Sequence, residues 1–212
     1  MVQRFGRWMS LPGLVFLMFA ILAVLPANSA MAGFRFRLAL TYVDGLQDLA
    51  DAYEDNIEIE ESGPFTYVDV DTMVWPVGIS LLPYYQWDNG LLMGVGVGPF
   101  IYGQFEGWDD DYTHWQVPVN FNIGYVVGPD NPVSFYVRGG PSYHFAGGDY
   151  YDGSSLGFLG AIGVEFFENS HFRVGLEASY DSAEVDIDNL QTGGTDGIRV
   201  AEFSAGVFFL FK

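Results

Sequence analysis

Apolar and polar side chains alternate along most of the chain, and this period of two constrains the fold more than any other feature. In the clearest segment, the residues at alternate positions are apolar and those between them are mostly small or polar. The apolar residues are Trp115, Val117, Val119, Phe121, Ile123, Tyr125 and Val127. Successive side chains of a strand point to opposite faces of a sheet, so such a segment predicts a strand with one apolar face. Seven further segments show the same alternation, at 33–43, 72–87, 91–105, 133–144, 157–166, 172–180 and 201–211.

The links between these segments alternate between short and long. Short turns at 88–90, 128–132 and 168–170 define one end of the fold, the turn end, and four long links define the other, the loop end. Eight strands joined in this way leave both chain ends at the turn end, as in an up-and-down barrel. The sequence therefore predicts an all-β fold, an eight-stranded antiparallel up-and-down transmembrane β-barrel. Because proline lacks the N–H that a sheet needs, we expect bulges or lost pairing at Pro76, Pro83, Pro99, Pro118 and Pro141.

The alternation alone does not say which face points outward, since a soluble lipocalin-like barrel carries its apolar face inside. On the apolar face, aromatic residues gather toward both ends of the predicted strands, as they do at the two surfaces of a bilayer. At the turn end these are Tyr85, Trp87, Tyr125, Phe166, Phe172, Phe209 and Phe211, and at the loop end they are Tyr42, Trp75, Phe105, Trp115, Tyr143 and Tyr180. We therefore expect the apolar face to contact lipid.

The polar parity is expected to line the bore of the barrel. Glycine and alanine share it with Arg and Glu, which suits an eight-stranded barrel whose interior is just wide enough for its own side chains. We expect these charged groups to pair inside and close the bore as a lumen network of Arg35, Arg37, Arg138, Arg173, Glu165, Glu177 and Glu202.

The first 32 residues are typical of a secretory signal peptide. Arg4 and Arg7 precede an apolar run, and Ala30 to Ala32 forms a cleavage site of the A-x-A type. We expect a signal peptide at 1–32 and the barrel domain at 33–212. The chain has 27 acidic and 8 basic residues, a formal charge of −19, which argues against nucleic acid as a partner. Most of the acids lie in the long links, so the loop end is expected to be strongly acidic.

The first long link is expected to be partly ordered. Its apolar residues at 46, 49, 50 and 53 have the spacing of one helix face with acids opposite, which predicts a short amphipathic helix. From Ile57 to Glu60 apolar and acidic residues alternate, and residues 65–71 alternate again after a turn near 62–64. This second pattern predicts a hairpin that extends the second strand.

The end of the chain carries a further pattern. Gly206, Phe209 and Phe211 fit the order Gly-x-x-Phe-x-Phe, although Ala205 stands where a polar residue is usual and Lys212 follows the last aromatic. With the eight alternating segments, this pattern resembles the small eight-stranded outer-membrane β-barrels of bacteria, the group of the OmpA transmembrane domain, OmpX and OmpW. The resemblance begins near Gly33 and implies Gly206, Phe209 and Phe211 as an assembly signal for the outer-membrane assembly machinery.

The same resemblance implies a place in the bacterial outer membrane, with export by the signal peptide and long links outside the cell. It implies outer-membrane lipid and lipopolysaccharide as partners, and a monomer. The leading expectation for function is a non-enzymatic barrel with a structural or surface-interaction role and no cofactor. Passage of small or apolar solutes through a narrow channel is an alternative, because glycines on the polar parity leave space in the bore.

Two chemical alternatives depend on particular residues. Some eight-stranded barrels resemble lipid A-modifying hydrolases that use His with Ser and an acid, and Ser142, His144 and Asp149 supply these groups. We expect Ser142 and His144 to point into the bore, away from lipid, so a hydrolase stays an alternative only. Asp109 to Asp111, and Asp186 to Asn189, offer oxygen ligands for divalent cations, but neither has the spacing of a dedicated calcium loop. No metal site is therefore assigned.

Overall fold

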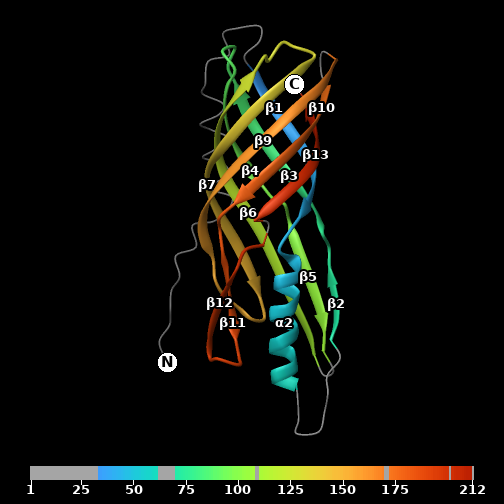
Figure 1. The fold of residues 1–212 in the computed structure, drawn as a ribbon, viewed down its shortest axis with the longest axis vertical. Helices are drawn as coiled ribbons and strands as arrows, with labels where there is room; N and C mark the ends of the chain where they lie inside the picture. Colours follow the sequence, from blue (N-terminus) through green and yellow to red (C-terminus); the bar gives the residue numbers. More distant parts are fainter. Residues whose placement is uncertain (1–32, 62–69, 108–109, 170–171, 201, 212) are drawn as a thin grey trace.

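The computed structural model describes residues 33–61, 70–107, 110–169, 172–200 and 202–211, which form a tall barrel (Figure 1). The predicted signal peptide at 1–32 lies outside these residues. The wall consists of β1 (Gly33–Val43), β2 (Asp71–Val74) with β3 (Val77–Gln86), β4 (Leu91–Val97) with β5 (Ile101–Glu106), β6 (Asp111–Val127), β7 (Val133–Gly148), β9 (Ser155–Asn169), β10 (Phe172–Asp181) and β13 (Phe203–Phe211). Antiparallel pairing of β1 with β13 and of β6 with β7 closes the ring. The predicted closed barrel of eight antiparallel strands is confirmed.

Two of the eight strands are interrupted at prolines that the sequence marked. Pro76 lies between β2 and β3, and Pro99 lies between β4 and β5. Gly98 has a φ of 101° and faces the Ile79 carbonyl so closely that a Cβ would lie 2.4 Å from its oxygen, so only glycine suits this position. The segment 98–100 also shifts the parity of β5. Ile101 and Phe105, which were expected to face outward, are therefore buried in the interior.

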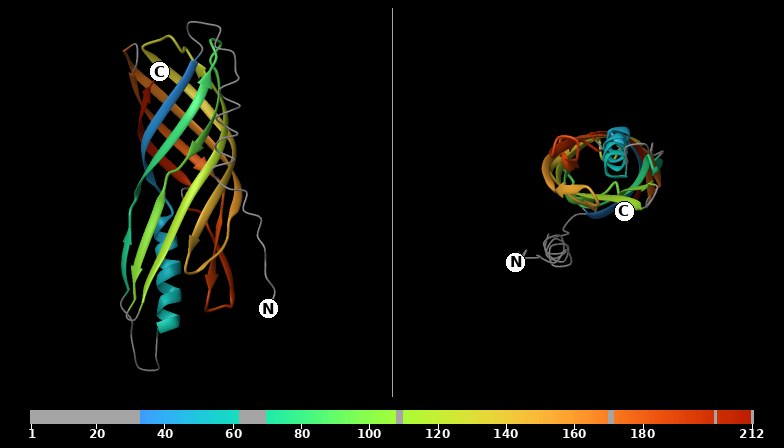
Figure 2. Two further views of the ribbon diagram at one scale, coloured as in Figure 1. Left: turned by 180° about the vertical axis from the view of Figure 1, so that it is seen from behind. Right: turned by 90° about the horizontal axis from the view of Figure 1, so that it is seen from below.

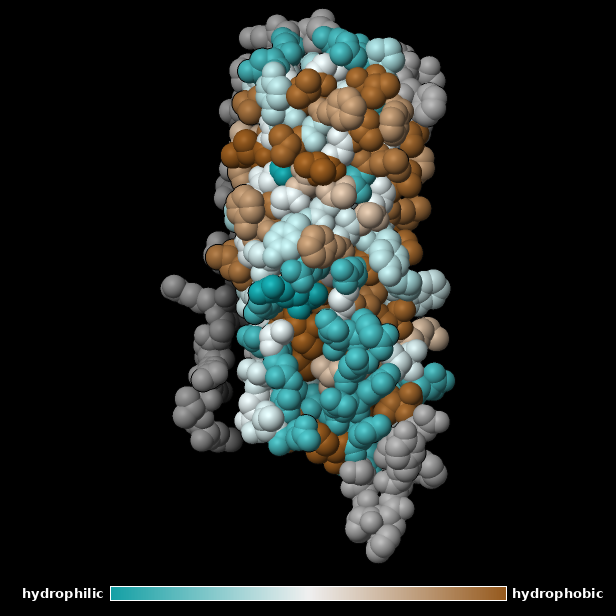
Figure 3. Space-filling model, viewed as in Figure 1, coloured by the Kyte–Doolittle hydropathy of each residue, from teal (hydrophilic) through white to brown (hydrophobic). Residues whose placement is uncertain are grey.

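The apolar parity faces outward, as expected for a wall in lipid. Ile162, Val137 and Tyr42 on the outside are each more than half exposed, whereas Arg37 and Glu165 on the inside are buried. Figure 3 shows apolar side chains gathered over the turn-end half of the barrel and hydrophilic ones over the loop-end half. This apolar belt excludes the lipocalin-like arrangement, whose apolar face would be inside. Tyr85 differs from the expected girdle, because its ring is buried and packs edge-on against Trp87 at 4.9 Å.

Beyond the belt, the loop end contains a helix and a small sheet. The helix α2 runs over Leu46–Glu61, and the sheet consists of β8 (Tyr151–Gly153), β11 (Val185–Asn189) and β12 (Gly194–Ile198). The predicted helix is confirmed, but the predicted strand from Ile57 to Glu60 is wrong. Ile57 lies one turn after Tyr53 on the same buried face, so the period of 3.6 continues through it. Residues 62–69 of the expected hairpin lie outside the described residues.

The helix is neither a membrane span nor a free loop segment. Among the described residues, no helix has the length and apolar character needed to cross a bilayer. Viewed along the barrel axis, α2 lies within the outline of the ring (Figure 2, right). Gly45 starts it with a φ of 78°, at a point where a Cβ would lie 2.3 Å from the Arg199 carbonyl oxygen. The chain thus turns from the wall straight into the mouth of the barrel.

Candidate functional site

The middle of the bore is crossed by an ion cluster whose members come from three strands. Glu177 of β10 lies 2.6 Å from Nη2 of Arg37 on β1 and 2.8 Å from Nε of Arg138 on β7. Tyr136 donates a hydrogen bond of 2.8 Å to the same carboxylate. The Arg37 guanidinium also lies 3.8 Å from the centre of the Phe208 ring, a cation–π contact. We call Arg37, Arg138 and Glu177 the central cluster.

A second ion pair closes the turn end. Arg173 of β10 and Glu165 of β9 are both buried, with Nη1 and Oε2 3.0 Å apart. The same guanidinium donates to Ser134 Oγ at 2.8 Å and to the Pro129 carbonyl at 2.7 Å. These hydrogen bonds tie the turn between β6 and β7 to the bore. Arg35 is buried at this end too, beside Tyr84, which is its neighbour in the strand register.

The structure places Arg35, Arg37, Arg138, Arg173, Glu165 and Glu177 in the bore. Glu202 does not join them. It lies before the start of β13, at the loop-end rim, 3.6 Å from the exposed Arg199. β13 begins two residues later than the alternating segment 201–211, so parity does not apply to Glu202. On β13 itself, Gly206 pairs with Thr41 of β1, and Phe211 lies between Phe36 and Phe172.

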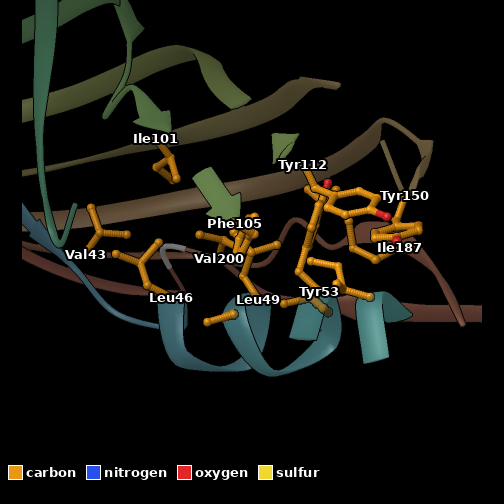
Figure 4. Packing of buried hydrophobic residues seen from close by; sticks show 14 residues of the cluster. Val43, Leu46, Leu49, Tyr53, Ile101, Phe105, Tyr112, Tyr150, Ile187 and Val200 are labelled. Carbon is orange, nitrogen blue, oxygen red and sulfur yellow. The ribbon is translucent and has the colours of Figure 1, made fainter. Parts of the chain in front are cut away.

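The loop end of the bore is filled by a hydrophobic core that sequence patterns did not reveal. We call this set the cap core (Figure 4), and it joins α2 to the wall and to the small sheet. Tyr53 is its centre, because its ring stacks on Phe105 of β5 at 4.3 Å and meets Tyr150 edge-on at 5.3 Å. Leu49 and Ile187 are fully buried beside it. Apart from residues of α2, the cap core contains Val43, Ile101, Tyr112, Val185, Ile198 and Val200 among others.

Hydrogen bonds fasten α2 around the cap core. Tyr150 donates to Glu60 at 2.6 Å, and Tyr112 donates to Glu61 at 3.1 Å. Burial raises the pKa of Tyr112 to about 12 and that of Tyr150 still further, so both hydroxyls remain protonated donors at physiological pH. Asn56, which is also buried, donates to the Asp188 carbonyl and accepts from the backbone N–H of Leu190 at 2.9 Å. The helix is therefore held on both sides.

Between the cap core and the central cluster lie Ser142 and His144, two residues of the hydrolase alternative. Both are buried inside the bore, as parity predicted. Nε2 of His144 lies 3.2 Å from Oδ2 of Asp181, an acid that the sequence did not single out. Asp149 instead accepts a hydrogen bond from the Thr113 N–H at 2.7 Å. The structure thus gives His144 a different carboxylate and places the group away from the lipid-facing surface.

Little space remains beside the central cluster. A cavity of about 30 Å³ lies there, lined by Thr41, Asn120 and Ser179 together with the cluster. In the described part of the chain, no group of three or more His, Cys, Asp or Glu residues is arranged to hold a metal ion. Of the two acidic segments considered for cations, Asp109 lies outside the described residues, and Asn189 donates to Asp196 at 2.6 Å.

Comparison with known proteins is consistent with this architecture. The crystal structure of the outer membrane protein OprG from Pseudomonas aeruginosa matches with a TM-score of 0.55 at 11% identity, over 87% of this chain and 96% of that one. Neisserial surface protein A matches with a TM-score of 0.43 at 12% identity, over 85% and 98%. Ail of Yersinia pestis matches with a TM-score of 0.37 at 12% identity, over 85% and 97%.

At 11% identity, the match to OprG supports a common fold alone. No curated protein sequence matches the chain. The family model described as "outer membrane protein beta-barrel domain" matches residues 14–211. Since this match extends over most of the sequence, the chain belongs to the outer membrane protein beta-barrel domain family.

Proposed function

We propose that the chain is a non-conducting, non-enzymatic barrel of the bacterial outer membrane that presents a folded acidic cap at the cell surface. Its role is then structural or surface-interactive, in contact with outer-membrane lipid and lipopolysaccharide. The observation that carries the proposal is the filling of the bore at three levels. These are the cap core, the central cluster and the pair Arg173–Glu165.

The surface of α2 supports the interactive part of this role. The face of the helix opposite the cap core is exposed and carries four acids, Asp48, Asp51, Asp55 and Glu58. The helix has no basic residue in its last turn. This face attracts basic groups of a partner, or divalent cations that bridge to anionic lipopolysaccharide.

The closed bore is tested by conductance. Purified full-length protein, folded into planar lipid bilayers, is expected to give no steady current above that of lipid alone, because buried side chains occupy the bore. A porin reconstituted in parallel shows that the bilayers report open channels. Steady steps of solute-sized conductance would refute the closed bore and favour the narrow-channel alternative.

The position of the cap is tested by labelling on intact cells. The sequence has no cysteine, so a single Asp55→Cys variant carries one thiol, on the exposed face of α2. A membrane-impermeant maleimide is expected to label it without breaking the outer membrane. The matched control is Asp88→Cys in the turn before β4, which should react only after permeabilisation. The reverse pattern would mean that the cap faces the periplasm.

A further inference from the structure

Two fully buried histidines lie at the junction of the cap core and the bore, and the proposed function uses neither. His144 of β7 contacts the carboxylate of Asp181. His114 of β6 contacts α2 instead, because its Nδ1 lies 3.2 Å from the hydroxyl of Tyr53. The two rings are also in edge contact, with centres 5.7 Å apart. One histidine therefore has a counter-charge, and the other meets the helix.

The partners of His114 are neutral. Tyr53 is a phenol whose pKa burial raises, and its hydroxyl also reaches the Thr113 carbonyl at 3.3 Å. On its own strand His114 interacts with the amide of Gln116, and on β7 the residue opposite is Gly148. The carboxylates of Asp149, after β7, and Asp188, of β11, are the charged groups that act on Tyr53, and both raise its pKa.

A proton on His114 would therefore place an unpaired cation beneath an apolar core. Charging a fully buried group without a counter-ion is unfavourable, and water can solvate the ring only if α2 moves away from it. The helix α2 begins at Leu46, beyond the apolar belt, and Tyr53 lies about 10 Å further along it at 1.5 Å per residue. The contact between Tyr53 and His114 is therefore outside the belt. Burial lowers the pKa of His114 to about 4, although the interaction with Gln116 raises it.

We propose that His114 is an acid-sensitive latch for α2. Uptake of a proton by its ring releases the helix from β5 and β6 at the loop end, while the barrel within the membrane stays folded. His144 is not part of the latch, because its ring contacts the carboxylate of Asp181 in the bore and not the helix. The latch rests on the geometry of the cap and not on whether the bore conducts.

The sign of the pH effect follows from linkage. The released ring regains the ordinary pKa of about 6.5, so the open state binds the proton more tightly than the closed one. Opening is therefore favoured as the pH falls through this range and is unaffected above it. With a pKa of about 4 in the closed state, the opening equilibrium rises about 30-fold between pH 7.5 and pH 5.

Hydrogen–deuterium exchange of the full chain, folded in detergent micelles, measures this opening. Amides of α2 are compared with the same peptides unfolded at each pH, which removes the intrinsic pH dependence of exchange. Protection in α2 is expected to fall about 30-fold from pH 7.5 to pH 5, with no change in β1.

Four variants of the three histidines decide the assignment. His114→Gln should abolish the acid response, and His114→Phe serves the same purpose if glutamine prevents folding. His144→Gln and His171→Gln, which change the other two histidines of the sequence, should retain it. The proposal is overturned if α2 keeps its protection at pH 5 in the unmodified protein. It is also overturned if the His114 variant responds as the unmodified protein does, or if β1 loses protection to the same extent as α2.

Discussion

Glu177→Gln is expected to lower the free energy of unfolding of the barrel by about 3 to 5 kcal/mol. The carboxylate is shared by Arg37 and Arg138, so its loss leaves two guanidinium groups in the bore without a counter-charge. Removing one partner of a buried pair is costly because the remaining charge cannot return to water. Glutamine keeps the shape of the side chain, so the loss reports charge and not packing. Urea unfolding in lipid vesicles, followed by tryptophan fluorescence, measures it.

A surface pair provides the matched control for this change. Arg199 and Glu184 lie 2.5 Å apart at the loop end, and each side chain is nearly half exposed. Glu184→Gln should leave the unfolding midpoint unchanged, because solvent screens such a pair. The double variant Glu177→Gln with Arg138→Gln should recover part of the stability by removing one uncompensated cation. Equal losses for Glu177→Gln and Glu184→Gln would show that the central cluster does not stabilise the bore.

The wall of the barrel was predictable because the side chains of a strand point alternately to lipid and to the bore, and because the bore is narrow. A lipid-facing side chain such as Ile162 has to be apolar, and its neighbours in the bore have to be small or paired. This requirement holds at every position of a regular strand, so it places Arg37 and Glu177 inside without any knowledge of register. It fails where regular strand geometry ends, and at Tyr85, which is buried within β3. Ile101 changed face after the irregular segment 98–100, and Glu202 precedes the strand it was assigned to.

The loop end was less predictable, because its contacts join segments far apart in the sequence. The helix was visible from its spacing, but nothing local indicates that Tyr53 packs against Phe105, Tyr150 and His114. The same holds for Asp181, which faces His144 across the bore from another strand. An aromatic residue near a membrane surface can belong either to the girdle that contacts lipid or to a buried core. Phe105 was expected in a girdle, yet it is part of the cap core, and alternation alone does not separate these roles.

Tyr53→Ala should detach the cap while leaving the membrane-spanning barrel intact. The ring is fully buried and touches three other rings, so its removal is expected to cost about 3 to 5 kcal/mol, as for other large aromatic residues in cores. The helix α2 contacts the wall less extensively than paired strands contact each other. The lost packing free energy is therefore expected to favour local opening of the helix and not unfolding of the barrel. At neutral pH, α2 should become accessible to protease.

The barrel serves as the internal reference for this prediction. Unheated protein should still migrate as a folded barrel in electrophoresis, since the strand pairs of β1 with β13 and β3 do not involve Tyr53. Tyr102→Ala removes the same type of ring from the outer face of β5, where Tyr102 is 40% exposed, and should leave α2 protected. If Tyr53→Ala instead unfolds the barrel, cap and wall form one cooperative unit, and a latch that frees the cap alone has no physical basis.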